Sequence, residues 1–223
     1  MTRSMEGRGG PRAARVVAAA GVGFAASWFL AAVSPAQADV YLDAGAGYFS
    51  PFDEDHRAAY GASPAFLLGI SSAVGNAGSR VFLEVEYVHA SGSEFTPDPT
   101  FEDRGRATYD LVPLTLGARF DLNGNPDQDL RVFLGLGARS LLTRWEGAGV
   151  SRSSPTTGAF VELRPEFRAG DHWTLWIRQR LDLIANVDYG REVAPLSYSG
   201  SSLALGISIS LDHAPLTPPR NDS

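Results

Sequence analysis

The segment FVELRPEFR, residues 160–168, limits the folds open to this chain more than any other feature. Charged side chains occupy every second position from Glu162 to Arg168, with uncharged residues between them. The segment WTLWIRQRLDL follows at residues 173–183 and again places its charged side chains on one parity. Strict alternation of this kind predicts β-strands with two chemically unlike faces. The fold must therefore offer an apolar and a polar environment on opposite sides of one sheet.

After residue 38 no segment shows the apolar spacing of an amphipathic helix. Eight strand-like runs are present instead, at residues 40–50, 64–74, 80–90, 109–121, 130–144, 158–168, 172–184 and 200–211. The connections between them alternate in length. The first (50–63), third, fifth (146–158) and seventh are long and rich in Gly, Pro, Ser and charge, whereas the others are short turns. Long loops at one end and tight turns at the other are typical of outer-membrane barrels.

The last run, SSLALGISISL at residues 201–211, has the clearest dyad repeat. Leucine and isoleucine occupy every odd position from Leu203 to Leu211, and Ser, Ala or Gly occupies every even one. Apolar outside and small or polar inside is the pattern of a transmembrane barrel strand. We therefore predict an all-β fold, an eight-stranded antiparallel up-and-down transmembrane β-barrel over residues 39–211. Its even strand number places both termini at the short-turn end.

The segments outside the barrel also have recognisable patterns. Residues 1–38 begin with several arginines, continue with an apolar run and end in an A-x-A pattern at Ala36 and Ala38. This predicts a signal peptide for Sec-type export that is cleaved after Ala38, and an uncleaved membrane anchor is the alternative. Residues 212–223 form a polar C-terminal tail.

The composition excludes several classes of function. The chain has no cysteine, which excludes disulfides and thiolate metal sites. Its net charge is −6 and every basic residue other than histidine is arginine, which argues against a nucleic-acid partner. The stretch DLNGNPDQD, residues 121–129, spaces its acids like a calcium loop but has Pro126 and Val132 where that loop needs glycine and an acid. We expect a turn there, with neither a metal site nor a cofactor.

The charges on the non-apolar parity belong in the barrel interior. An arginine facing lipid at the membrane midplane costs about 2–4 kcal/mol. In the lumen, arginines and carboxylates can pair, and an eight-stranded barrel is only wide enough to be filled by side chains. We expect a structural charge network without a continuous pore. An ion or proton path and a carboxylate–arginine catalytic site are the alternatives. The predicted network comprises Glu84, Glu86, Arg119, Arg139, Glu162, Arg164, Glu166, Arg168, Arg178, Arg180 and Asp182.

The chain resembles the small eight-stranded outer-membrane β-barrels of the OmpX-like and opacity-protein-like group. The resemblance lies in the N-terminal signal, in DVYLDAGAGYF (39–49), in YDLVPLTLGARFDL (109–122) and in the final alternating strand. It implies an outer-membrane location and insertion by the barrel assembly machinery. We expect lipid and lipopolysaccharide as partners, a monomeric state, and a non-enzymatic role in surface interaction, adhesion or envelope integrity. The chain departs from the group by ending its last strand on Leu211, not on an aromatic residue.

Two further functions stay open. His89 and Ser91 share one strand face, which resembles the His-x-Ser arrangement of outer-membrane lipid A deacylases, with Glu94 to orient the histidine. Gly92 stands where those enzymes have asparagine. The other alternative is a soluble periplasmic barrel that binds a small apolar ligand as lipocalins do. It requires the apolar parity to face inward.

Two details of the strands also carry predictions. Pro113 and Pro165 lie inside strand-like runs and lack the N–H that a ladder requires, so we expect a bulge or a local break at each. Aromatic residues near the strand ends predict two interfacial girdles. These are Tyr48, Phe66 and Tyr87 toward the long loops, and Phe120, Phe167 and Trp173 toward the short turns.

Overall fold

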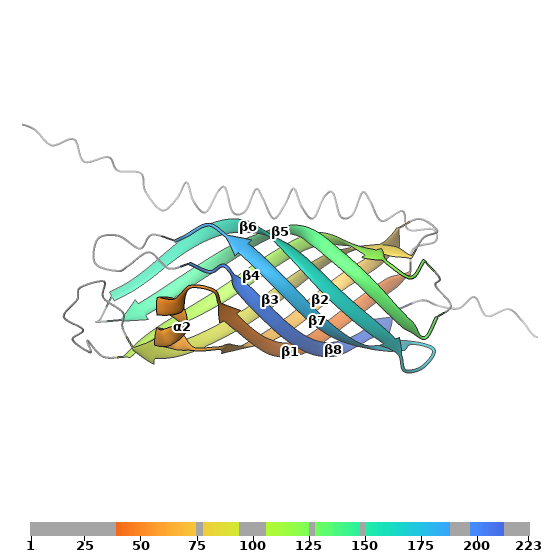
Figure 1. Cartoon of the computed structure of the whole chain (residues 1–223), viewed down its shortest axis with the longest axis horizontal. Coiled ribbons are helices and arrows are strands. Elements are labelled where there is room, and N and C mark those ends of the chain that lie inside the picture. The colour runs from red at the N-terminus through yellow and green to blue at the C-terminus, as the bar shows by residue number, and fades with distance from the viewer. Residues whose placement is uncertain are drawn as a thin grey trace, which may run out of the picture.

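The eight strands form one closed antiparallel barrel in which each strand pairs with its neighbours in sequence (Figure 1). The computed structural model describes residues 39–74, 78–93, 106–124, 128–147, 150–187 and 197–211. The predicted eight-stranded up-and-down topology is confirmed. The strands are β1 (Val40–Pro51), β2 (Ser63–Val74), β3 (Ser79–Ser93), β4 (Arg106–Asp121), β5 (Leu130–Gly147), β6 (Val150–Arg168), β7 (Trp173–Ile184) and β8 (Gly200–Ser210).

The barrel closes where β1 pairs with β8, from Tyr41↔Ser210 to Pro51↔Gly200. Two of its pairs, Gly45↔Gly206 and Gly47↔Ala204, join only small residues. A Cβ added to Gly47 would lie 2.1 Å from the Leu203 carbonyl oxygen. Glycine therefore allows the backbones of β1 and β8 to come close enough to complete the ladder.

The β5–β6 connection differs from the prediction. Residues 146–158 were predicted as a long loop, but β6 begins at Val150 and continues the ladder through pairs such as Glu146↔Ser151. The Ser, Thr and Pro residues of this segment were interpreted as loop signals. In the barrel they extend a hairpin, because β5 offers them an unbroken partner strand.

The first long connection contains a helix, α2 (Glu54–Tyr60), where the sequence analysis expected none. The Asp53 side chain caps it by accepting a hydrogen bond from the backbone N–H of His56 at 2.8 Å. Gly61 ends it with a positive φ of 68°. Seven residues are too few to show a helical repeat in the sequence, and burial of the helix stabilises it instead. Within the parts of the chain that the structure describes, no helix is long and apolar enough to cross a membrane.

Pro113 and Pro165 each coincide with a local break, as predicted. The β3–β4 ladder passes from Val85↔Leu114 to Val88↔Leu111 with no pair between them, beside Pro113. The β6–β7 ladder is interrupted in the same way beside Pro165. In both places the ladder to the other neighbour is continuous and the register is unchanged. The missing N–H thus removes pairing on one side only, without a bulge.

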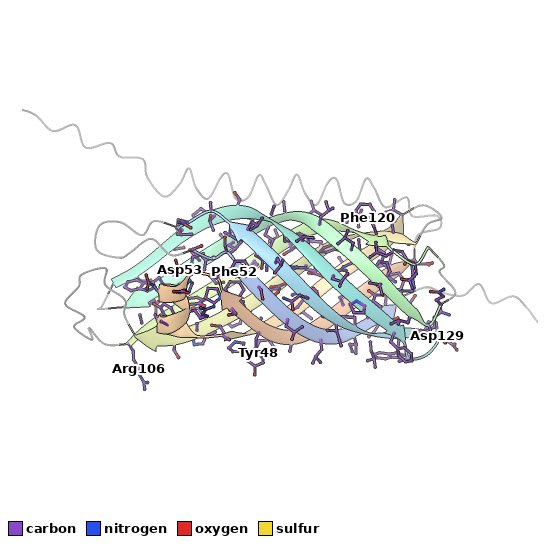
Figure 2. The ribbon with its side chains drawn as sticks, in the orientation of Figure 1. Tyr48, Phe52, Asp53, Arg106, Phe120 and Asp129 are labelled. Carbon is purple, nitrogen blue, oxygen red and sulfur yellow. The ribbon has the colours of Figure 1, made fainter. Side chains whose placement is uncertain are left out.

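The two faces of the barrel wall are opposite in character. Leu205 is 68% exposed on the outside, whereas Arg119, Arg164 and Arg180 are completely buried inside. The soluble lipocalin-like alternative is therefore wrong, because it required the apolar parity to face inward. All six predicted girdle aromatics are exposed on the outer face. Figure 2 shows Tyr48 pointing away from the barrel wall, and it labels Phe120 nearer the short-turn end.

Candidate functional site

The barrel interior has three layers along its axis. At the long-loop end, an apolar and aromatic cluster packs against α2, which lies at that end of the barrel (Figure 1). The middle is filled by buried arginines, aspartates and glutamates. At the short-turn end the interior opens into a polar cavity. The candidate functional sites are the ionic layer, helix α2 with the aromatic cluster that it covers, and a group of polar side chains on the outer wall.

Arg180 and Arg119 form the centre of the ionic layer. From β7, Arg180 donates to Glu162 at 2.8 Å, to Glu86 at 2.7 Å and to Glu84 at 2.5 Å. From β4, Arg119 donates to Glu162 at 2.7 Å and also contacts Glu84. Both guanidinium groups are fully buried. Charge-assisted hydrogen bonds to several carboxylates offset the cost of removing each cation from water.

The remaining arginines extend this network along the axis. Arg139 donates to Glu86 at 2.6 Å and contacts Asp182. Arg178 donates to Glu84 at 2.9 Å and to Glu86 at 2.8 Å. The carboxylates on β3 therefore bind arginines from β4, β5 and β7 at once. Such contacts across the lumen tie opposite walls of the barrel together.

Aromatic rings complete the packing around these cations. The Arg119 guanidinium carbon lies 3.8 Å from the centre of the Phe82 ring, and that of Arg180 lies 4.6 Å from the Phe160 ring. Arg164 lies over Trp176 at 4.4 Å and donates to Asp43 at 2.7 Å. Stacking on a ring stabilises a cation in a site with little water.

The structure buries ten of the eleven predicted network residues and leaves one exposed at the short-turn mouth. Arg168 is exposed because β6 ends there, at the short-turn mouth of the barrel. Its side chain is on the inward face of the strand, but at the mouth the opposite walls no longer enclose it. Asp43 and Arg80 are buried members that the sequence analysis missed. Alternation along the strands could have identified both. Asp43 lies on the face of β1 opposite the outward Tyr48, and Arg80 lies on the same face of β3 as Glu84. Within the described residues the buried network then holds six acids and six arginines, so its formal charges cancel.

Helix α2 covers the aromatic end of the interior. The His56 ring lies 5.4, 5.1 and 5.3 Å from the rings of Tyr60, Tyr109 and Tyr198. Its Nδ1 donates to the Ser197 carbonyl at 2.8 Å, which fixes the tautomer because a carbonyl only accepts. Trp145 Nε1 donates to the Tyr60 hydroxyl at 3.0 Å. Burial lowers the pKa of His56, so the ring is held in its neutral form.

The His89 cluster lies on the outer wall toward the long loops. His89 Nδ1 is 2.8 Å from Asp110 Oδ1 on β4, and the Tyr87 hydroxyl donates to the same oxygen at 2.8 Å. The carboxylate that contacts His89 is thus Asp110, whereas Glu94, expected in that role, lies outside the described residues. Ser91 is exposed two residues further along β3. Among the residues that the structure describes, no hydrogen bond joins His89 to Ser91 and no group of three or more His, Asp or Glu could hold a metal ion.

Comparison with known proteins supports the fold. No protein-family model matches the chain, and neither does any curated protein. Among solved structures, the outer membrane protein OprG from Pseudomonas aeruginosa matches with a TM-score of 0.58 at 12% identity, covering 79% of this chain and 97% of that one. A major outer membrane protein from Thermus thermophilus matches with a TM-score of 0.55 at 12% identity, covering 78% and 98%. The chain therefore has the fold of the small outer-membrane β-barrels.

Proposed function

We propose that the protein is an integral outer-membrane barrel that serves as a rigid anchor for the long connections at one end. The exposed apolar wall is the observation that supports this most directly. Side chains such as Leu68, Ile177 and Leu205 are more than half exposed on neighbouring parts of the surface. Water-soluble monomers rarely expose a continuous apolar surface larger than a few hundred Å². In a bilayer the apolar wall is in contact with acyl chains and not with water, so its exposure no longer costs free energy.

The interior suits an anchor better than a pore. Its charges are paired and balanced, and its long-loop end is covered by α2. The proposed role is accordingly non-enzymatic. The barrel holds the long connections at the cell surface, where surface interaction, adhesion or a contribution to envelope integrity would take place. Outer-membrane lipid and lipopolysaccharide are the proposed neighbours of the wall, and the barrel assembly machinery is the proposed route of insertion.

Membrane fractionation combined with heat modifiability tests this proposal. The expressed chain should sediment with outer membranes, resist extraction with carbonate, and shift in apparent mass when boiled in SDS. Recovery of the folded chain in the soluble periplasmic fraction, with no detergent requirement, would reject the proposal.

A lipid A hydrolase remains a second candidate, because His89 is oriented by Asp110 on the lipid-facing side of the wall. In such an enzyme the histidine would act as the base for the Ser91 hydroxyl. Mass spectrometry of lipid A from expressing cells tests this candidate. Unchanged acyl chains, or a change that persists in Ser91→Ala, would eliminate it.

A further inference from the structure

A polar cavity of about 270 Å³ lies inside the short-turn mouth of the barrel. It is separate from the ionic centre around Arg180 and at the opposite end from α2. Its lining combines side chains of both signs, including Arg80, Arg131, Glu166, Asp39, Asp129 and Asp171. The volume is close to the lower limit of small-molecule pockets, so a ligand would have the size of an amino acid or a dipeptide.

Arg80 is the buried cation of this cavity. Its guanidinium carbon lies 3.9 Å from the Tyr41 ring and 4.8 Å from the Phe133 ring, and its Nη1 donates to Glu166 at 3.2 Å. Only 3% of the residue is exposed. Within the described residues, its Nε and Nη2 have no hydrogen-bond partner. The protein thus holds the guanidinium rigidly while two of its donor atoms remain available to a ligand.

A second cation is fixed on the wall of the cavity. Arg131 donates to Asp121 through Nε at 2.9 Å and through Nη2 at 2.7 Å. It also donates to the Gly78 carbonyl at 3.1 Å, and its guanidinium carbon lies 4.8 Å from the Phe133 ring. The side chains of Arg80 and Arg131 therefore approach the same ring.

The rim of the cavity carries more acidic than basic side chains, three aspartates against Arg168, with His172 beside them. Asp39, Asp129 and Asp171 are all exposed there, and Figure 2 labels Asp129 at this end of the barrel. Backbone hydrogen bonds hold the rim in place, among them Arg168 N–H to the Asp129 carbonyl at 2.8 Å. The cavity is therefore polarised, with the buried Arg80 inside and a rim whose formal charge is net negative.

We propose that this cavity binds a small zwitterion, with the ligand carboxylate on Arg80 and Arg131 and the ligand ammonium among the rim aspartates. A simple anion would face Glu166 and the rim carboxylates, and a simple cation would face the arginines of the lining. A ligand that carries both charges can pair its carboxylate with the arginines and its ammonium with the rim aspartates. Arginine is suited to two-point carboxylate recognition. With both termini at the short-turn end, the cavity faces the periplasm in the proposed membrane orientation. Free amino acids and the two ends of a short peptide are the two sources of this chemistry.

Titration of the full folded barrel in detergent, followed by NMR chemical shifts, tests the assignment. The probes are L-alanine and L-alanyl-L-alanine, with acetate and methylamine as single-charge controls. One of the two zwitterions should bind about tenfold more tightly than either control, since each lost charged contact weakens binding by about that factor. The tighter zwitterion identifies the source, because the two differ in the separation of their charges.

Two variants make the test specific to the site. Asp129→Asn alters only the exposed rim and should weaken zwitterion binding several-fold while leaving acetate binding unchanged or stronger. The charge-balanced double variant Arg80→Met, Glu166→Gln should abolish binding, and a heat-modifiability gel verifies that it folds. Arg144→Gln, on the outer wall at the opposite end, is the matched control. The assignment is overturned if neither zwitterion binds, if acetate binds as tightly as the zwitterions, or if both site variants bind like the unmodified protein.

Discussion

Replacing Arg180 with leucine removes an interior side chain that donates to three glutamates. Arg180 contacts Glu84, Glu86 and Glu162 at distances of 2.5 to 2.8 Å, and it is completely buried. Leucine fills part of the same space without a charge. The substitution therefore tests whether ion pairing, and not only packing, stabilises the closed barrel.

The magnitude of the effect follows from what each carboxylate retains. Removing one partner of a buried ion pair destabilises a protein by about 3–5 kcal/mol. Here Glu84 keeps Arg178 at 2.9 Å, Glu86 keeps Arg139 at 2.6 Å, and Glu162 keeps Arg119 at 2.7 Å. No acid is left without a cation, so we expect the lower end of the range, about 3 kcal/mol.

The assay is urea unfolding of the barrel in lipid vesicles, followed by the fluorescence of its tryptophans. Arg144→Leu is the matched control, because Arg144 is 61% exposed beside Glu146 and such surface pairs contribute at most about 1 kcal/mol. Adding Glu162→Gln to Arg180→Leu restores the balance of charges. The double variant should be less destabilised than the sum of the two single variants by about 0.5–3 kcal/mol. If Arg180→Leu costs no more than Arg144→Leu, the network does not stabilise the fold and the reasoning is refuted.

Three further perturbations test other parts of the structure. Leu205→Arg should lower the free energy of unfolding in vesicles by about 2–4 kcal/mol, because it places a cation against lipid. An unchanged free energy of unfolding in this variant would mean that β8 lies outside the bilayer. Gly206→Val should prevent folding, since an added Cβ would lie 2.2 Å from the Ala44 carbonyl oxygen, whereas Gly170→Ala meets nothing within 4 Å and should fold normally on a heat-modifiability gel. Burial lowers the pKa of His56, and the groups that face it are Asp53, the Ser197 carbonyl and the rings of Tyr60, Tyr109 and Tyr198. The unfolded chain therefore binds a proton more readily, and stability at the α2 end should fall as the pH drops below about 6.5, then level off below the folded pKa; an unchanged pH profile of urea midpoints in His56→Gln would contradict this.

The strands and the direction of their side chains could be predicted because both depend on a period of two. Alternation placed Glu162 and Arg164 on one face of the wall and Leu163 on the other, and the structure has the first two buried and Leu163 exposed. It could not decide which parity faced inward, since a lipocalin-like barrel satisfies the same pattern. The small residues of the polar face, the aromatic residues at the strand ends and the alternating loop lengths favoured the membrane barrel, and the buried Arg119 and Arg180 agree with that choice.

Other features could not be predicted because they depend on contacts distant in the sequence. Helix α2 is seven residues long and is held by His56 and Tyr60 packing against Tyr109 and Tyr198. The extension of β6 depends on the partner residues of β5. The carboxylate beside His89 could not be identified from the sequence, because it depends on the register between β3 and β4. That register pairs His89 with Asp110.

The central claim is that the apolar parity of the wall faces lipid and the charged parity faces the lumen. The chain has no cysteine, so a single spin label can be placed at each position of β8 in turn without further substitutions. In vesicles, labels at Leu203, Leu205 and Ile207 should collide frequently with dissolved oxygen and rarely with a water-soluble nickel complex. Labels at Ser202, Ala204 and Ser208 should be inaccessible to both. Frequent collisions of the odd-position labels with the nickel complex, or oxygen access without alternation along β8, would contradict a lipid-facing wall around a closed ionic interior.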